Sequence, residues 1–363
     1  AANIMVSLAA LLTGCIAASA QIKIGDSIEV DKITHNFGDV LLDSGPLNCE
    51  YTITNTGDEP CVIYNVTTSC GCTEAEWTRQ PLKKGEKGKI SVSYSNDEGP
   101  YPFDKSVTVY LSNVKKPLIL KLKGVSQEKM RPLESQYPIH FGALGLRETY
   151  IKCGNLEQGR SKTETIIVAN ISSNPLQLDF KDISENLDIQ VSPNPVPAKS
   201  TAEISFTVNS DKDKWGKNNY WATPVLNGRV ISENGKIRKL GVWAFTKENF
   251  DDLSESEISK GSMPRFASST FNFGKVPVGT EIHATFKLKN EGKSCFCVHK
   301  VDVDACCYSH SDIPVADPGE EITFRVHLDT KDMHAGECLK IVTLTTNSPL
   351  RPIVNLFISG ILE

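Results

Sequence analysis

The sequence has no run of basic residues, because its 39 Lys and Arg are outnumbered by 44 Asp and Glu and its formal net charge is -5. Without a basic stripe to follow a phosphate backbone, nucleic acid is not an expected partner. Apolar runs long enough to span a bilayer are missing after the first 20 residues. Amphipathic helix patterns are scarce, which argues against a helical fold.

The sequence also lacks the usual catalytic signatures. We find no nucleophile elbow, phosphate-binding loop, HExxH motif or paired-carboxylate pattern, and the seven histidines are scattered. Cysteine with histidine can form a protease site, but the cysteines here are crowded and expected to be oxidised. We therefore expect no enzymatic activity, no catalytic residue and no cofactor.

The N-terminus has the features of an export signal. Residues 1–20 carry no charge, contain the apolar run Ile4–Leu12 and end in the small residues Ala18-Ser19-Ala20. This pattern predicts a signal peptide over 1–20, although the basic start is missing and a few preceding residues are expected. We expect the protein to be exported to the periplasm or the cell surface.

A second interpretation of the same segment is lipidation. Leu12-Thr13-Gly14-Cys15 resembles a bacterial lipobox, which would attach a lipid to Cys15 and tether the protein to the outer membrane. The residues after Cys15 stay apolar up to Ala20, whereas a lipoprotein tether is usually polar. Cleavage after Ala20 is therefore the favoured interpretation, and a membrane tether is expected only if Cys15 is lipidated.

From residue 30 onward, short alternating runs separated by Gly, Pro, Asn and Asp predict β-strands. Each of three units begins with a similar segment and then reaches a strand that ends in asparagine. The beginnings are His35–Val40, Ile139–Leu144 and Phe271–Val276, and the strand ends are Asn55, Asn170 and Asn290. About seven strands per ~100 residues is typical of an Ig-like β-sandwich. We therefore predict an all-β chain of three tandem Ig-like domains at 28–128, 133–247 and 264–363. The acidic segment at 248–263 is predicted to be a solvated linker, with a marginal helix as the alternative.

The first unit carries the residues of a known family. His35-Asn36-Phe37-Gly38-Asp39-Val40, Ile53–Pro60, Ser69-Cys70-Gly71-Cys72-Thr73 and Trp77 together resemble the bacterial domain-of-unknown-function family 1573. The resemblance is specific over 33–124, weaker over 268–361, and reduced to a Phe-Gly start over 137–245. It implies a Hydin-like or sperm-protein-like Ig sandwich in secreted proteins of Bacteroidota-like bacteria, with no established catalytic role.

An oxidising compartment favours disulfides for most of the eleven cysteines. In the first unit, Cys49 and Cys61 could meet across the core if both of their strand faces point inward. The resembled family generally keeps Cys-Gly-Cys and has an aliphatic residue in place of Cys61. The resemblance therefore implies a Cys49–Cys61 bond and a separate local Cys70–Cys72 bond.

A disulfide between Cys70 and Cys72 requires a bent backbone, since residues i and i+2 of an extended strand are about 6.5–7 Å apart. Gly71 is expected to lower the conformational free energy of that bend, because glycine has no Cβ. A structural disulfide is the favoured interpretation, and a redox-active pair or a soft-metal ligand such as a copper-like ion site is the alternative.

The third unit is denser in cysteine than a sandwich needs. Two disulfides and one free or buried thiol are expected among its five cysteines, which are Cys295, Cys297, Cys306, Cys307 and Cys338. Metal binding by this cluster, with His299 and His310 nearby, is the alternative. Cys153 stands alone in the second unit and is expected to be buried or to pair with another chain.

A polar stretch of the second unit is rich in aromatic residues. Trp215, Tyr220 and Trp221 could lie on a loop that stacks on a sugar or anchors a protein, or they could cover the sandwich core. The overall prediction is a non-enzymatic structural or binding protein that presents loops and sheet edges to a protein or glycan partner. The alternative is a thiol-redox or soft-metal protein that uses Cys70-Gly71-Cys72.

Overall fold

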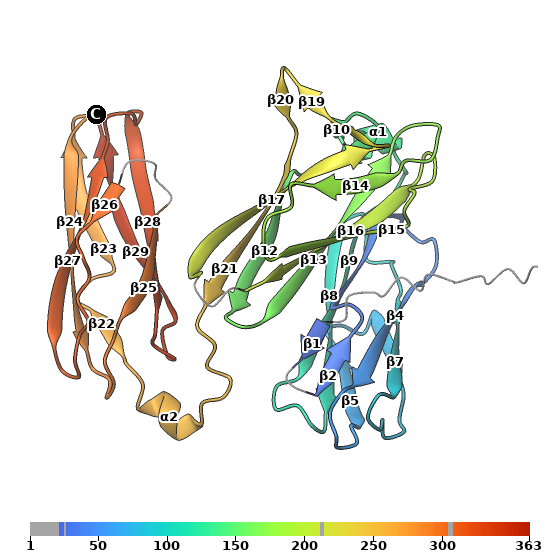
Figure 1. Cartoon of the computed structure of the whole chain (residues 1–363), viewed down its shortest axis with the longest axis horizontal. Helices are drawn as coiled ribbons and strands as arrows, with labels where there is room; N and C mark the ends of the chain where they lie inside the picture. The colour runs from blue at the N-terminus through green and yellow to red at the C-terminus, as the bar shows by residue number, and fades with distance from the viewer. Residues whose placement is uncertain (1–21, 25–26, 211–213, 304–307) are drawn as a thin grey trace, which may run out of the picture. The chain divides into compact units, whose positions relative to one another are not determined.

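The computed structural model of the chain describes residues 22–24, 27–210, 214–303 and 308–363. The predicted signal peptide and Cys15 lie outside these residues. The chain divides into two compact units, 1–128 and 129–363, and the described strands form one sandwich in the first and two in the second (Figure 1). The predicted all-β fold of tandem sandwiches is confirmed. No helix of the described segments has the length and apolarity needed to cross a membrane.

The first sandwich pairs a sheet of order β1-β2-β4-β7-β6 with a sheet of order β3-β9-β8-β5. Its core takes large side chains from both sheets, among them Tyr51, Ile90 and Leu120. The strands are β1 (Ile22–Ile24), β2 (Ile28–Val30), β3 (Thr34–Leu41), β4 (Leu47–Asn55), β5 (Ile63–Thr68), β6 (Thr73–Trp77), β7 (Lys87–Tyr94), β8 (Pro102–Leu111) and β9 (Leu118–Gln127).

The second sandwich pairs β10-β11-β13-β16-β15 with β12-β21-β17-β14, and β18 extends β17. Its core contains Phe141, Phe206 and Tyr220. The elements are α1 (Leu133–Gln136), β10 (Ile139–Phe141), β11 (Leu144–Leu146), β12 (Tyr150–Glu157), β13 (Ser161–Asn170), β14 (Leu178–Lys181), β15 (Leu187–Ser192), β16 (Thr201–Asn209), β17 (Gly216–Leu226), β18 (Arg229–Val230), β19 (Ser232–Glu233), β20 (Lys236–Ile237) and β21 (Leu240–Lys247).

The third sandwich pairs β22-β24-β27-β26 with β23-β29-β28-β25. Inward side chains alternate strictly with exposed ones along β24, which is why this strand can cover a core on one face and meet water on the other. The elements are α2 (Glu255–Ser259), β22 (Pro264–Phe266), β23 (Thr270–Val276), β24 (Glu281–Asn290), β25 (Val298–Val303), β26 (Tyr308–His310), β27 (Glu321–Asp329), β28 (Gly336–Thr346) and β29 (Ile353–Leu362).

The asparagine that ends β4, β13 and β24 has the same role in all three sandwiches. Asn55, Asn170 and Asn290 are fully buried. Each amide donates to the carbonyl four residues later and to a carbonyl of the segment before the next strand of the same sheet, as Asn290 Nδ2 does to Ser294 O at 2.8 Å and Ala316 O at 2.9 Å. The side-chain oxygen accepts from the backbone two residues on. One side chain therefore satisfies a turn and fixes it to the neighbouring segment.

The first strand of one sheet in each sandwich runs parallel to the last strand. These pairs are β3–β9, β12–β21 and β23–β29, and each contains a register shift beside a glycine with positive φ. The glycines are Gly38, Gly154 and Gly274. Such a conformation favours glycine, because a Cβ is disfavoured in the left-handed region.

This arrangement corrects the predicted equivalence of Ile139–Leu144 with the segments that begin the other two units. Ile139–Leu144 forms the antiparallel β10–β11 hairpin and does not pair with β21. The strand equivalent to β3 and β23 is β12, in which Cys153-Gly154 takes the place of Phe37-Gly38 and Phe273-Gly274. The similar sequence His140-Phe141-Gly142 therefore lies at the end of β10, and not on the strand equivalent to β3 and β23.

The acidic linker contains the one-turn helix α2, where a solvated linker was favoured. Ser254 accepts from Glu257 N, and the Glu257 carboxylate accepts from Ser254 N, which completes a capping box. The Ser-x-x-Glu spacing was the available sequence signal for this helix.

Candidate functional site

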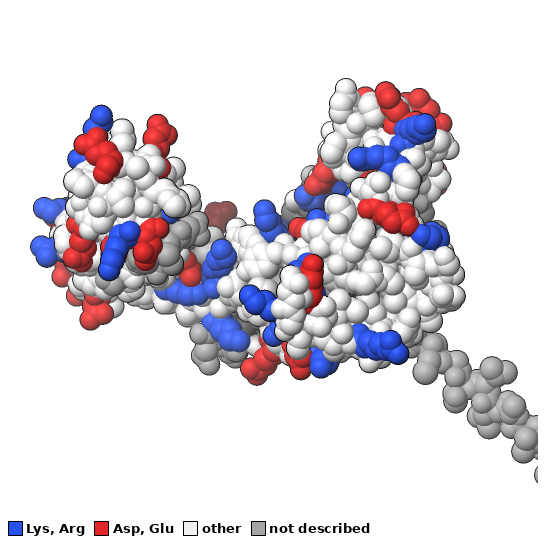
Figure 2. Space-filling model, turned by 90° about the horizontal axis from the view of Figure 1, so that it is seen from above, with Lys and Arg blue, Asp and Glu red and all other residues white. Residues whose placement is uncertain are grey.

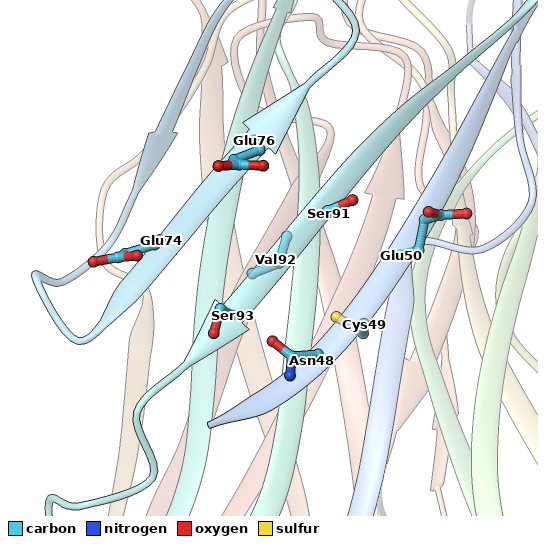
Figure 3. A pocket seen from close by; sticks show the side chains of 8 residues that line it. All are labelled: Asn48, Cys49, Glu50, Glu74, Glu76, Ser91, Val92 and Ser93. Carbon is cyan, nitrogen blue, oxygen red and sulfur yellow. The ribbon is translucent and has the colours of Figure 1, made fainter. Parts of the chain in front are cut away.

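The outward face of β4, β7 and β6 in the first sandwich carries a hollow of about 450 Å³. The register places Glu50, Ser91 and Glu76 in one row across the three strands, and Asn48, Ser93 and Glu74 in the next. Figure 3 shows the two serines of the central strand between the glutamates of β6 and the side chains of β4. Serine is small, so the middle of this face lies lower than its flanks.

The hollow is acidic. Lys89 pairs with Glu50 at 2.9 Å, whereas Glu74 and Glu76 make no ion pair within the described parts of the chain. On the face that Figure 2 shows, the two signs of charge are interspersed. A second hollow of about 390 Å³ shares Glu74 and Ser93 and continues to Gly71, Cys72 and Asp97. The acidic surface therefore extends along β6 to the loop that precedes it.

β6 is an edge strand. It pairs with β7 alone, and Thr78 N donates to Lys89 O while Ser95 N donates to Cys72 O. Because the backbone groups of a strand point alternately to its two sides, the peptide groups of Ala75 and Trp77 face the open edge. The Trp77 indole donates to Ile63 O at 3.0 Å and Arg79 stacks on its ring, which holds this end of the edge in place.

The loop before β6 contains a disulfide between Cys70 and Cys72, with a Cα–Cα distance of 5.3 Å. Thr68 Oγ1 donates to Cys70 O at 3.1 Å, and Thr73 N donates to the same carbonyl at 3.3 Å. Gly71 has no positive φ, and a Cβ placed on it would contact nothing. The bend therefore does not use the left-handed conformation that favours glycine, and another small residue would also fit there.

A carboxylate lies beside this disulfide. An oxygen of Glu98 and both sulfurs lie within 4.8 Å of one another. Lys105 donates to Glu98 at 2.5 Å, and this hydrogen bond lowers the pKa of the Glu98 carboxyl. Burial, together with the nearby Glu98 charge, raises the pKa of Tyr94 to about 12. The polar contacts leave Glu98 ionised close to the two sulfurs.

The implied Cys49–Cys61 disulfide is wrong, because both residues are free, buried thiols. Cys49 lies near the start of β4, whereas Cys61 pairs with Leu82 beside Asn55, at the end of that strand. Six residues of strand separate these places by about 20 Å. Burial raises the pKa of both thiols, and Cys61 fills a core position that Leu176 and Phe296 occupy in the other sandwiches.

The third unit also departs from the expected disulfides. Cys295, Cys297 and Cys338 are free, and Cys306 and Cys307 lie outside the described residues. Cys338 lies at the start of β28, and the backbone of Cys297 bonds to Asn347 just beyond its other end. Eight residues of strand separate the two ends by about 27 Å, too far for a bond. Cys153 is buried, and burial raises the pKa of its thiol to about 11.

The predicted aromatic loop is the strand β17. Tyr220 is buried in the core, Trp215 is partly buried just before the strand, and Trp221 is exposed and packs beside Tyr150. Tyr220 is therefore unavailable to a ligand. Sequence reasoning missed the acidic hollow instead, although the alternation Glu74-Ala75-Glu76 after Cys72 was a signal of an acidic strand face.

The repeated two-sheet topology defines the chain as a tandem Ig-like β-sandwich protein. The family described as "Protein of unknown function (DUF1573)" matches residues 28–126 and 264–362, which together are more than half of the sequence. The chain belongs to this family, as the resemblance predicted.

Similar solved structures are distant. A protein of unknown function from Porphyromonas gingivalis W83 is 15% identical with a TM-score of 0.48, over 61% of this chain and 100% of its own. The cadherin-like domains 1 to 4 of zebrafish RET are 8% identical with a TM-score of 0.28, over 91% of this chain and 74% of theirs. A PapD-like domain of human CEP192 is 9% identical with a TM-score of 0.24, over 31% and 92%. A search of curated proteins finds no match.

Proposed function

We propose that this protein is an exported, non-enzymatic binding protein whose first sandwich takes an extended, basic segment of a protein partner along β6. The open edge of β6 beside the acidic hollow is the observation that supports the proposal. An added strand would bond to the outward peptide groups of Ala75 and Trp77. Its outward side chains would then lie next to Glu74 and Glu76, where lysine or arginine is favoured by about 0.2–1 kcal/mol per pair.

A ten-residue peptide of alternating lysine and threonine tests this proposal, with alternating glutamate and threonine as the matched peptide. We expect the full chain to bind the lysine peptide measurably in fluorescence anisotropy, and less tightly as salt rises, because exposed charge pairs are screened. Glu74→Lys combined with Glu76→Lys should weaken binding at least about tenfold. Ala75→Pro should do the same by removing an outward N–H donor.

Glu59→Lys is the matched control, since it makes the same charge change on an exposed turn that belongs neither to β6 nor to the hollow. It should leave the affinity within about twofold. Equal binding of both peptides, or undiminished binding by Ala75→Pro, would contradict the proposal. Binding of a polysaccharide in place of both peptides would assign the hollow to a glycan.

A second candidate function is thiol redox or soft-metal binding at Cys70 and Cys72. The nearness of Glu98 to both sulfurs favours it, because reduction would leave two thiols and a carboxylate in one place. Mild reductant followed by alkylation and peptide mapping should then label Cys70 and Cys72. Cys49, Cys61 and Cys153 should stay unlabelled, since they are buried and their pKa values are raised. A pair that resists strong reductant in the folded protein would exclude this function.

A further inference from the structure

The third sandwich carries a cluster of two histidines and a glutamate on the outward face of β24 and β27. Glu281 and His283 are two residues apart on β24, so their side chains point to the same side of the sheet. His327 of β27 lies directly opposite His283 in the register. His283 and His327 are 44 residues apart along the chain, and the pairing of β24 with β27 brings them together.

The atoms that could bind an ion converge. The Nδ1 atoms of His283 and His327 are in hydrogen-bonding contact, and the two rings meet edge to face with centroids 4.5 Å apart. One oxygen of Glu281 lies 3.9 Å from His283 Nε2, and the other lies 4.0 Å from His327 Nδ1. The carboxylate therefore faces both rings, and one ligand atom from each residue lies within 4.8 Å of the others.

The strands that carry these residues are held rigidly. Ile282 and Ala284 flank His283, Val326 and Leu328 flank His327, and all four side chains are buried in the core. The backbone positions of the three polar residues are therefore fixed, while their outward side chains can rotate. Ligands on rigid strands lose little entropy when they bind an ion.

The fold itself does not require imidazoles at this place. Counting back from the buried asparagine of each sandwich, the pair equivalent to His283 and His327 is Asn48 with Ser93 in the first and Thr163 with Thr207 in the second. The two threonines simply bond to each other at 2.8 Å. Small polar residues satisfy the sheet there, so the histidine pair is specific to the third sandwich.

We propose that Glu281, His283 and His327 bind Zn²⁺ or a similar divalent transition-metal ion through one nitrogen of each ring and one carboxylate oxygen. Two ligands of a tetrahedral zinc ion lie about 3.3 Å apart, given bond lengths of about 2.0–2.1 Å. The two Nδ1 atoms are closer than this. The Glu281 oxygens are farther, at 3.9 Å from His283 Nε2 and 4.0 Å from His327 Nδ1, so the His283 ring and the carboxylate must rotate to bring one nitrogen of each ring and one oxygen to the required geometry. The site is open to solvent, which leaves the remaining coordination position to water or to a group of another molecule.

The test uses Co²⁺ and Zn²⁺ with the full chain, after its accessible thiols have been alkylated. We expect Co²⁺ to give visible absorption bands without the intense charge-transfer band of thiolate ligation, and Zn²⁺ to displace it. His283→Gln and His327→Gln should each weaken Zn²⁺ binding at least about 30-fold in calorimetry, and Glu281→Gln at least about threefold. His140→Gln, which changes an exposed histidine of the second sandwich, should leave the affinity within twofold.

The variants change outward side chains, so circular dichroism should show unaltered folding without metal. Thermal unfolding gives a test that needs no variant. Zn²⁺ should raise the unfolding midpoint of the unsubstituted protein, and a chelator should reverse this increase. Zn²⁺ binding that persists in both histidine variants, or that disappears when the thiols are alkylated, would overturn the proposal. So would the absence of any Zn²⁺ binding by the alkylated protein.

Discussion

Asn290→Ala should lower the free energy of unfolding of the third sandwich by about 3 kcal/mol. The amide of Asn290 satisfies the carbonyls of Ser294 and Ala316, and its oxygen accepts from Gly292 N at 3.0 Å and Met263 N at 3.1 Å. Alanine removes the side-chain partner of Ser294 O, Gly292 N and Met263 N, and it leaves Ala316 O with Phe296 N alone, around a position that is fully buried at Asn290. Hydrogen exchange measured by mass spectrometry should show faster opening in peptides of 264–363 than in those of the other sandwiches.

Two further variants separate the hydrogen bonds from the volume of the side chain. Asn290→Asp keeps the shape but replaces two donors with a carboxylate that faces two carbonyls, so it should cost at least as much as alanine. Asn355→Ala removes an exposed asparagine of β29 and should change the free energy of unfolding by less than about 0.5 kcal/mol. If Asn290→Ala costs no more than Asn355→Ala, the buried amide does not hold the turn.

Gly360→Ala should destabilise the third sandwich by about 2 kcal/mol. Gly360 lies in β29, and a Cβ added to it would overlap the ring of Phe273 on the neighbouring strand β23. The least costly relief is rotation of Phe273 away from the core, which exposes part of its ring to water. Urea unfolding should show the loss as a lower midpoint with an unchanged slope.

A double-mutant cycle tests this origin. Phe273→Ala combined with Gly360→Ala should be no less stable than Phe273→Ala alone, because the clash is gone. The second sandwich offers the natural comparison, since Ala244 occupies the place of Gly360 and Cys153 that of Phe273. Ala244→Gly should cost about 1–2 kcal/mol, through backbone freedom and the loss of a buried methyl group. Additive losses in the cycle would show that the ring is not the obstacle.

The fold was predictable because its signals are local. Alternating apolar and polar residues, as in β24, are visible in the sequence because the strand is buried on one face only. The asparagines at strand ends are also visible, because each unit needs a buried side chain that bonds to the following turn. The beginning of the second unit was not predictable in this way. His140-Phe141-Gly142 matches the other units in composition, but pairing with the last strand belongs to Lys152-Cys153-Gly154.

The sites depended on contacts that a sequence does not display. Alternation indicated that Cys49 and Cys61 could both point inward, but not that Cys61 lies beside the far end of the strand that carries Cys49. His283 and His327 are 44 residues apart, and only the register of β24 and β27 brings them together. A partial signal existed, since Asn290 and the turn at Pro318-Gly319 fix where both strands begin to pair.

The parallel pairing of the first and last strands also determines how each sandwich responds to mechanical force. In β3–β9, β12–β21 and β23–β29 the two strands run in the same direction, so a pull on the chain at both ends slides one strand along the other. Their hydrogen bonds are then loaded in shear and must break together, whereas an antiparallel hairpin pulled from its open end separates one bond at a time. We therefore expect each sandwich to resist extension once the pulling force reaches these parallel pairs.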